Sequence, residues 1–228
     1  MNLTAAAALP GSFADSLREI TAAIALGGAV MWAIVLLSVA TLALILWKTW
    51  QLLAFGAWSG GAHTQRALAH WAEGREQDAV AALTGRRSLR ARLACAAMRA
   101  ARHPGMGRAA AESETSRVAR ALLQRAGAGL RALELASTIG PLLGLLGTIT
   151  GMIAAFQALQ LAGARADPAT LAGGIWEALL TTAAGMAVAI PAQVALTWFE
   201  SVVDRLRHDM EDAAAQVFLR GPGSDGPR

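Results

Sequence analysis

A single carboxylate marks the part of this sequence that is best suited to chemistry. Glu177 is the only ionisable residue between Pro168 and Phe199, in a stretch of apolar, small or weakly polar residues. A charge at bilayer depth costs about 2.5–3.5 kcal/mol on insertion scales, so such residues generally serve a function. At about 1.5 Å per residue, Glu177 lies roughly 14 Å beyond Pro168, near the middle of a hydrocarbon core about 30 Å thick. The residue suits a proton or cation pathway; the alternative is a structural carboxyl bonded to a neighbouring helix.

Three threonines are candidate partners of this carboxylate. On an ideal helix Thr181 shares the face of Glu177, whereas Thr182 is rotated by about 140°. Thr182 could still line a lumen shared between neighbouring subunits, so both residues stay candidates. Thr148 lies near the middle of another uncharged run. Its hydroxyl either bonds to its own helix or faces a polar lumen.

Glycines follow the same two uncharged runs. Pairs at the spacing small-xxx-small let helix backbones approach closely in a membrane. We therefore expect close helix packing at Gly140, Gly144, Gly147, Gly151 and Gly185.

The hydrophobic pattern predicts an all-α integral membrane protein with three transmembrane helices and long cytoplasmic helical extensions. Residues 20–47 lack charge, exceed a signal-peptide core in length and follow no basic segment, so a span is favoured over a cleaved leader. Ser12 is suited to cap a short interfacial helix before this span. The predicted order is a periplasmic segment 1–19, spans 20–47, 135–164 and 168–199, a cytoplasmic helical segment 48–134, a periplasmic turn 165–167, and a cytoplasmic helix with a disordered tail over 200–228.

Basic residues set the expected orientation. Only 16% of the residues are charged, and the net charge of +4 comes mainly from arginines between 48 and 131. The positive-inside rule places this segment in the cytoplasm, the N-terminus and the 165–167 turn outside, and the C-terminus in the cytoplasm. Within it, 64–72 and 89–101 have helical patterns, 103–107 is a break, and 109–131 is expected to run directly into the second span.

Other chemistries lack the residues they need. Cys95 is the only cysteine, so no internal disulfide is possible, and no acidic or cysteine cluster completes a metal site around His63 and His70. No phosphate loop is present, and one glutamate without an intramembrane histidine cannot form a protease centre. The arginines are explained by topology and anionic lipid rather than nucleic acid. We therefore expect no cofactor, no metal and no enzymatic activity.

The residues around the carboxylate are similar to a known family. The runs Pro-Leu-Leu-Gly-Leu-Leu-Gly-Thr-Ile-Thr-Gly-Met at 141–152 and Gly-Ile-Trp-Glu-Ala-Leu-Leu-Thr-Thr-Ala-Ala-Gly-Met-Ala-Val-Ala-Ile-Pro at 174–191 resemble the MotA/TolQ/ExbB proton-channel family, and ExbB most of all. The specific resemblance covers about 135–200. Elsewhere it rests on the three-span topology, which differs from the four spans of MotA-type stators.

The resemblance implies a motor subunit in the bacterial inner membrane. The family forms a pentamer around the single transmembrane helices of an ExbD- or TolR-like partner, and its pore is lined by residues that match Glu177, Thr148 and Thr182 here. An ExbB-type subunit uses the proton motive force, with a TonB-like protein, to energise outer-membrane import of iron-siderophores, haem or vitamin B12. The alternative is a TolQ-like subunit of a Tol-Pal envelope motor with a TolA-like partner. A structural scaffold, a solute transporter and a sodium rather than proton pathway are further alternatives.

Overall fold

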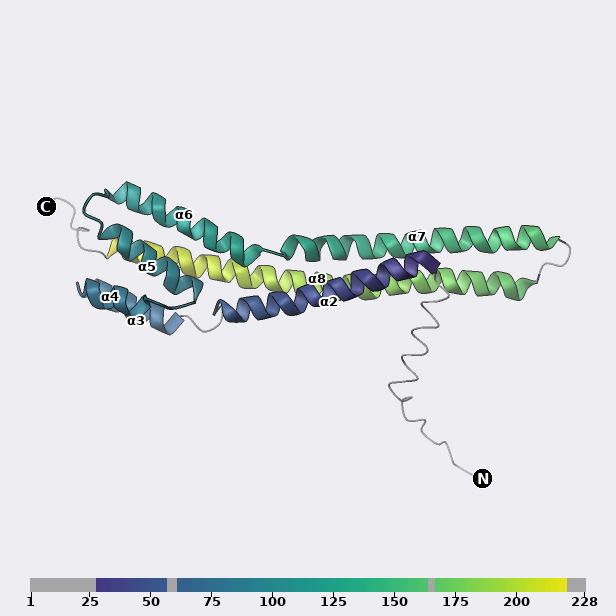
Figure 1. Ribbon diagram of the computed structural model, residues 1–228, viewed down its shortest axis with the longest axis horizontal. Coiled ribbons are helices and arrows are strands. Elements are labelled where there is room, and N and C mark those ends of the chain that lie inside the picture. The colour runs from purple at the N-terminus through teal and green to yellow at the C-terminus, as the bar shows by residue number, and fades with distance from the viewer. Residues whose placement is uncertain (1–27, 57–60, 164–166, 221–228) are drawn as a thin grey trace, which may run out of the picture. The chain divides into compact units, whose positions relative to one another are not determined.

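The computed structural model describes residues 28–56, 61–163 and 167–220, and the described residues form helices without a strand (Figure 1). The helices are α2 Gly28–Ala54, α3 Gly61–Ala72, α4 Glu76–Leu83, α5 Leu89–Ala101, α6 Arg108–Gly127, α7 Leu130–Ala162 and α8 Pro168–Leu219. Three helical stretches are long and apolar enough to cross a membrane: Gly28–Ala54, Arg108–Ala162 and Pro168–Leu219. The predictions of an all-helical chain and of three candidate spans are confirmed.

The chain divides into two compact units. One contains the described residues up to Leu42 together with Glu134–Gln193, and the other contains Ala43–Leu133 and the described residues from Val194 onward. Several expectations fall outside the described residues: the N-terminal helix with Ser12, the start of the first span, most of the 165–167 turn and the tail from 221.

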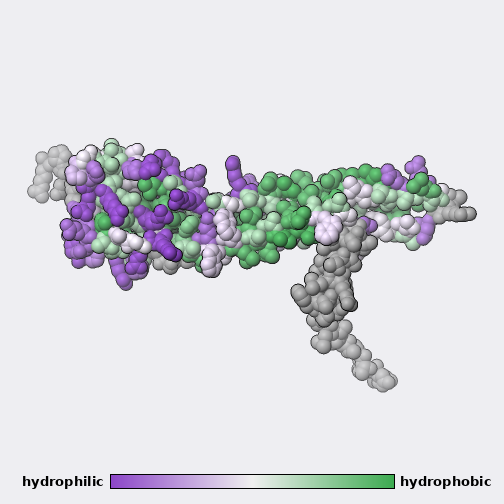
Figure 2. All heavy atoms as spheres, viewed as in Figure 1, coloured by the Kyte–Doolittle hydropathy of each residue, from purple (hydrophilic) through white to green (hydrophobic). Residues whose placement is uncertain are grey.

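The first unit consists of α2, α7 and α8 segments with apolar surfaces. Large apolar side chains are exposed on all three helices, among them Leu36 at 69%, Leu142 at 59% and Ile190 at 63%. Figure 2 shows hydrophobic side chains gathered over the long helices. Such faces suit contact with lipid or with other membrane helices.

Small residues hold α7 and α8 in close contact. A Cβ on Gly140 would lie 2.9 Å from the carbonyl oxygen of Gly185, and one on Gly144 would lie 2.9 Å from the Cα of Thr182. A Cβ on Gly151 would lie 3.0 Å from the Cβ of Ala178. Since these atoms belong to backbone or Cβ positions that cannot swing aside, only glycine permits this antiparallel contact, which we call the glycine seam.

The start of α8 is fixed by a local cap. The backbone N–H of Ala169 donates to the carboxylate of Asp167 over 3.0 Å. Pro168 occupies the first helical position, where its missing N–H leaves no intrahelical bond unmade. The helix then continues through Pro191, and α7 likewise continues through Pro141.

The second unit has buried apolar clusters between its helices. Trp71 of α3 is 1% exposed and donates its indole N–H to the carbonyl oxygen of Val217 in α8 over 2.9 Å. Arg90 of α5 forms an ion pair with Asp209 of α8. Figure 2 shows hydrophilic side chains over α3 to α6. The predicted helices at 64–72 and 89–101 and the break at 103–107 are confirmed, while α4 was not predicted.

The expected continuous helix from 109 into the second span is wrong at one point. Ala128 is extended, with φ −57° and ψ 134°, and Gly129 has a φ of +87°, in the left-handed region that favours glycine. A Cβ on Gly129 would also lie 2.9 Å from Cζ3 of Trp47. The chain therefore breaks between α6 and α7 where α2 packs closely.

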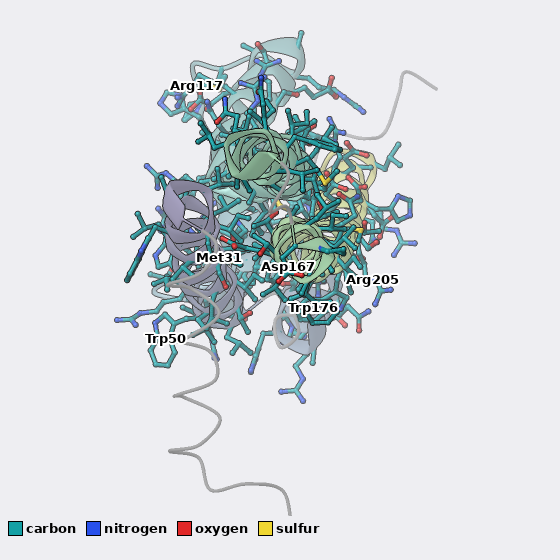
Figure 3. All side chains as sticks on the ribbon, turned by 90° about the vertical axis from the view of Figure 1, so that its right-hand side faces the viewer. Met31, Trp50, Arg117, Asp167, Trp176 and Arg205 are labelled. Carbon is teal, nitrogen blue, oxygen red and sulfur yellow. The ribbon has the colours of Figure 1, made fainter. Side chains whose placement is uncertain are left out.

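Lys48 of α2 stabilises this break. Its side chain is 1% exposed, and its ammonium donates to the carbonyl oxygens of Ala126 and Ala128 and, over 3.0 Å, to the side-chain oxygen of Gln51. The last carbonyls of a helix lack intrahelical donors, and a cation there also complements the helix dipole. Nearby on α2, Trp50 is 75% exposed and points away from the helices (Figure 3).

Candidate functional site

Glu177 lines a cavity within the first unit. The cavity has a volume of about 310 Å³ and is bounded by three helices. Its lining residues are Gly28, Ala29 and Val30 of α2, Gly147, Thr150 and Gly151 of α7, and Glu177, Ala178 and Thr181 of α8. The carboxyl of Glu177 is the only ionisable group among them, and the two threonines supply hydroxyls. The side chain of the neighbouring Trp176 is 69% exposed (Figure 3), whereas that of Glu177 is half-buried.

Thr181 is the buried hydroxyl beside Glu177. Its side chain is 2% exposed, and its hydroxyl donates to the carbonyl oxygen of Ala178 over 2.7 Å, with the carbonyl oxygen of Gly144 at 3.3 Å. A Cβ on Gly147 would lie 2.6 Å from the Cβ of Thr181. The absence of a side chain at Gly147 therefore makes room for Thr181 in the glycine seam.

Thr148 and Thr182 form a second polar group that does not line this cavity. Their hydroxyl oxygens lie 3.4 Å apart, and Thr182 donates to the carbonyl oxygen of Gly144 over 3.0 Å. Thr148 donates to the carbonyl oxygen of Leu145 over 2.7 Å, a bond within its own helix. The Gly144 carbonyl thus lies within hydrogen-bond distance of Thr181 and Thr182, and it links the two groups.

Thr148 also borders a wider hollow along α7. This hollow has a volume of about 520 Å³, and its lining residues are mostly apolar with two amides. They are Thr148, Ile149, Met152, Ile153, Phe156, Gln157 and Gln160. The structure therefore brings Glu177 together with Thr181, and Thr148 together with Thr182.

Thr150 is a residue of the cavity that sequence reasoning missed. Its side chain is exposed, and its hydroxyl donates to the carbonyl oxygen of Leu146 over 3.0 Å or of Gly147 over 3.1 Å. A signal was present in the sequence, since Thr150 directly precedes Gly151 of the expected packing positions. Its proximity to Glu177 depends on the pairing of two helices, which no single helix reveals.

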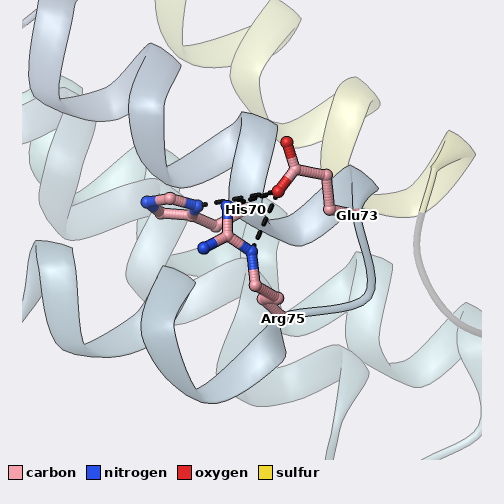
Figure 4. A network of polar contacts seen from close by, with 3 residues as sticks. All are labelled: His70, Glu73 and Arg75. Carbon is pink, nitrogen blue, oxygen red and sulfur yellow. Dashed lines mark hydrogen bonds and ion pairs between the residues drawn. The ribbon is translucent and has the colours of Figure 1, made fainter.

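No metal site emerges among the described residues. None of them form a group of three or more histidine, cysteine, aspartate or glutamate side chains that could hold an ion. His70 lies 4.0 Å from the carboxylate of Glu73, which also accepts a hydrogen bond of 2.9 Å from Arg75 (Figure 4). This surface network at the end of α3 is a set of local ion pairs.

Comparisons with a family model and with individual proteins find similarity to the same family. The family model described as the MotA/TolQ/ExbB proton channel family matches residues 85–212. Biopolymer transport protein exbB1 of Vibrio cholerae is 40% identical over 86 residues, which cover 36% of this chain and 38% of that protein. Biopolymer transport protein ExbB of Xanthomonas campestris is 35% identical over 120 residues, which cover 47% of each chain.

A cyanobacterial protein shows the same pattern. The putative biopolymer transport protein ExbB-like 1 of Synechocystis is 45% identical over 89 residues, covering 38% of this chain and 34% of that protein. The chain thus spans less than half the length of these three curated relatives. The matched family region contains Glu177, the threonines and the glycine seam.

Proposed function

The chain belongs to the MotA/TolQ/ExbB proton channel family, and we propose that it is the proton-conducting subunit of an ExbB-type motor in the bacterial inner membrane. The observation that carries this proposal is the cavity in which Glu177 is the only ionisable residue among the described lining residues and is accompanied by the hydroxyls of Thr150 and Thr181. A carboxyl that alternates between its neutral and charged forms can bind and release protons inside the membrane. One proton crossing 100 mV releases about 2.3 kcal/mol, which such a motor can convert into motion.

The assembly we propose follows the family. Five copies of this chain surround the single transmembrane helices of an ExbD-like partner, and a TonB-like protein carries the motion across the periplasm. The large exposed apolar side chains of α7, such as Leu145 and Ile149, supply surface for contacts with other membrane helices. In this arrangement Thr148 and Thr182 face the partner helices, while the N-terminus lies outside and the C-terminus in the cytoplasm.

Proton conduction is favoured over sodium by the number of oxygen atoms at the site. In the part of the chain that the structure describes, one carboxylate and two hydroxyls line the Glu177 cavity. Hard cations are bound by about six or more oxygens in well-formed protein sites. A proton needs only one carboxyl oxygen and a hydrogen-bonded route.

The role of Glu177 is tested by Glu177→Gln, expressed with the ExbD-like neighbour in a strain that lacks the native subunit. The amide keeps the size of the side chain but cannot exchange a proton, so we expect normal assembly and loss of TonB-dependent uptake of chelated iron. Glu200→Gln is the matched control, because Glu200 is an exposed residue of the same helix outside the cavity. Normal uptake with Glu177→Gln would make the carboxyl a structural group.

A TolQ-like role is the second candidate, because the family that matches residues 85–212 includes both branches. The two roles predict different phenotypes for a strain that lacks this chain. Loss of growth on scarce chelated iron indicates a TonB-type system. Sensitivity to detergent with normal iron uptake indicates an envelope-maintenance motor.

A further inference from the structure

The residues that line the Glu177 cavity are of two kinds: some are polar, and the others are small and apolar. Of the described lining residues, Glu177, Thr150 and Thr181 are polar, and the others are glycine, alanine or valine. At about 310 Å³ the cavity has room for several water molecules, each of which occupies about 30 Å³ in the liquid. A carboxyl and two hydroxyls also provide hydrogen-bond partners for water held in the cavity.

Thr150 presents its oxygen as an acceptor. The hydroxyl hydrogen is directed to the carbonyl oxygens of Leu146 and Gly147, at 3.0 and 3.1 Å, so the lone pairs of the oxygen remain for another donor. Thr181 likewise donates to a carbonyl of its own helix. Both hydroxyl oxygens can therefore accept a hydrogen bond from a water molecule.

The second polar group, formed by Thr148 and Thr182, lies outside the Glu177 cavity. Thr182 and Thr148 meet at 3.4 Å and do not line the Glu177 cavity, although the carbonyl of Gly144 is shared between Thr181 and Thr182. The carboxyl therefore has a polar environment within one copy of the chain, on the side that includes the beginning of α2.

We infer that this cavity is a water-holding chamber through which protons reach Glu177 within a single subunit, and that Thr150 is a positioning residue that holds the water next to the carboxyl. The inference rests on the proposed function and adds a route and a residue to it. Protons reach the carboxyl by way of water held by Thr150. The species that the chamber holds are water molecules and the hydrated proton.

The test is proton flux into vesicles that contain the reconstituted complex with its single-span partner and an internal pH-sensitive dye. Thr150→Val removes the hydroxyl with little change of shape, and we expect flux to fall about tenfold, the rate equivalent of one lost hydrogen bond. Thr150→Ser restores the hydroxyl and should recover most of the flux. Thr138→Val is the matched control, because its hydroxyl makes the same 3.0 Å bond to a carbonyl of α7 without lining the cavity.

The outcomes separate the chamber from the proposed function. Wild-type flux no greater than that of Glu177→Gln would refute proton conduction itself. Conduction that depends on Glu177 but is unchanged in Thr150→Val would refute the chamber alone. A fall that Thr150→Ser does not recover would assign Thr150 a packing role and also overturn the inference.

A second measurement does not depend on assembly of the valine variant. Thr150→Cys is introduced into a Cys95→Ala parent, since Cys95 is the only native thiol. A charged, water-soluble thiol reagent should modify the new cysteine and lower the flux, because the added group occupies the route. An unmodified thiol would show that water does not reach the cavity.

Discussion

The glycine seam makes a quantitative prediction at Gly144. A Cβ at this position would lie 2.9 Å from the Cα of Thr182, 3.0 Å from the carbonyl oxygen of Thr181 and 3.2 Å from that of Thr182. All three neighbours are backbone atoms, so no rotamer change can relieve the contact. Carbon atoms attract best at about 3.5–4.0 Å, so Gly144→Ala requires the two helices to separate by roughly 0.6–1 Å.

This separation affects both packing and hydrogen bonding. Overpacking of this kind typically destabilises a core by about 1–3 kcal/mol. It would also stretch the 3.0 Å bond from Thr182 to the Gly144 carbonyl beyond normal length, and such a bond in a membrane is worth about 0.6 kcal/mol. Alanine has a higher helix propensity than glycine, which offsets up to about 1 kcal/mol, so we expect Gly144→Ala to lower the free energy of unfolding by about 0.5–3.5 kcal/mol.

Gly173→Ala is the matched control on α8. Nothing lies within 4 Å of a Cβ built on Gly173, so the methyl group meets open space. Alanine stabilises a helix by up to about 1 kcal/mol relative to glycine, so this variant should be neutral or more stable. Each free energy can be measured by reversible unfolding in micelles, with the oligomer followed by native mass spectrometry. Equal stability of Gly144→Ala and wild type, or an equal loss in Gly173→Ala, would contradict the close contact.

Two further predictions concern the second unit. Lys48→Met should lower the free energy of unfolding by about 2–3 kcal/mol, because the carbonyls of Ala126 and Ala128 lose a charged donor. Thermal unfolding measures this loss, and an unchanged midpoint would exclude a stabilising role. Trp71→Phe keeps the buried ring but removes the bond to the Val217 carbonyl, so a loss of about 1 kcal/mol is expected in the same assay. A loss much larger than this would indicate that packing of the indole dominates.

The sequence predicted the elements that depend on local chemistry. A span beginning at 168 was expected, and α8 begins at Pro168, where the carboxylate of Asp167 accepts a hydrogen bond from the N–H of Ala169. The apolar runs predicted the long helices, because lipid contact demands continuous apolar surface. The break at 103–107 followed from its proline and glycines.

The break between α6 and α7 was missed because it depends on a distant residue. Gly127 and Gly129 stand in an alanine-rich helical pattern, and without a proline they do not by themselves end a helix. Trp47 packs within 2.9 Å of the position that a Gly129 Cβ would take, and Lys48 donates to the carbonyls that the break exposes. Both residues lie in α2, far away in the sequence. Only their tertiary contacts select the left-handed conformation of Gly129.

The grouping of the threonines has the same kind of explanation. A helical wheel relates Glu177 to Thr181, because both lie on α8, but it cannot state which residues of α7 face them. That choice is made by the register of the glycine seam, in which Gly144 lies against Thr182 and Gly151 lies against Ala178. In this register the missing side chains of Gly144 and Gly151 leave room for the backbone of Thr182 and the methyl group of Ala178. Thr150 and Glu177 are the chain neighbours of Gly151 and Ala178, so this contact brings both residues to within about one helical turn of the same level, and both line the cavity.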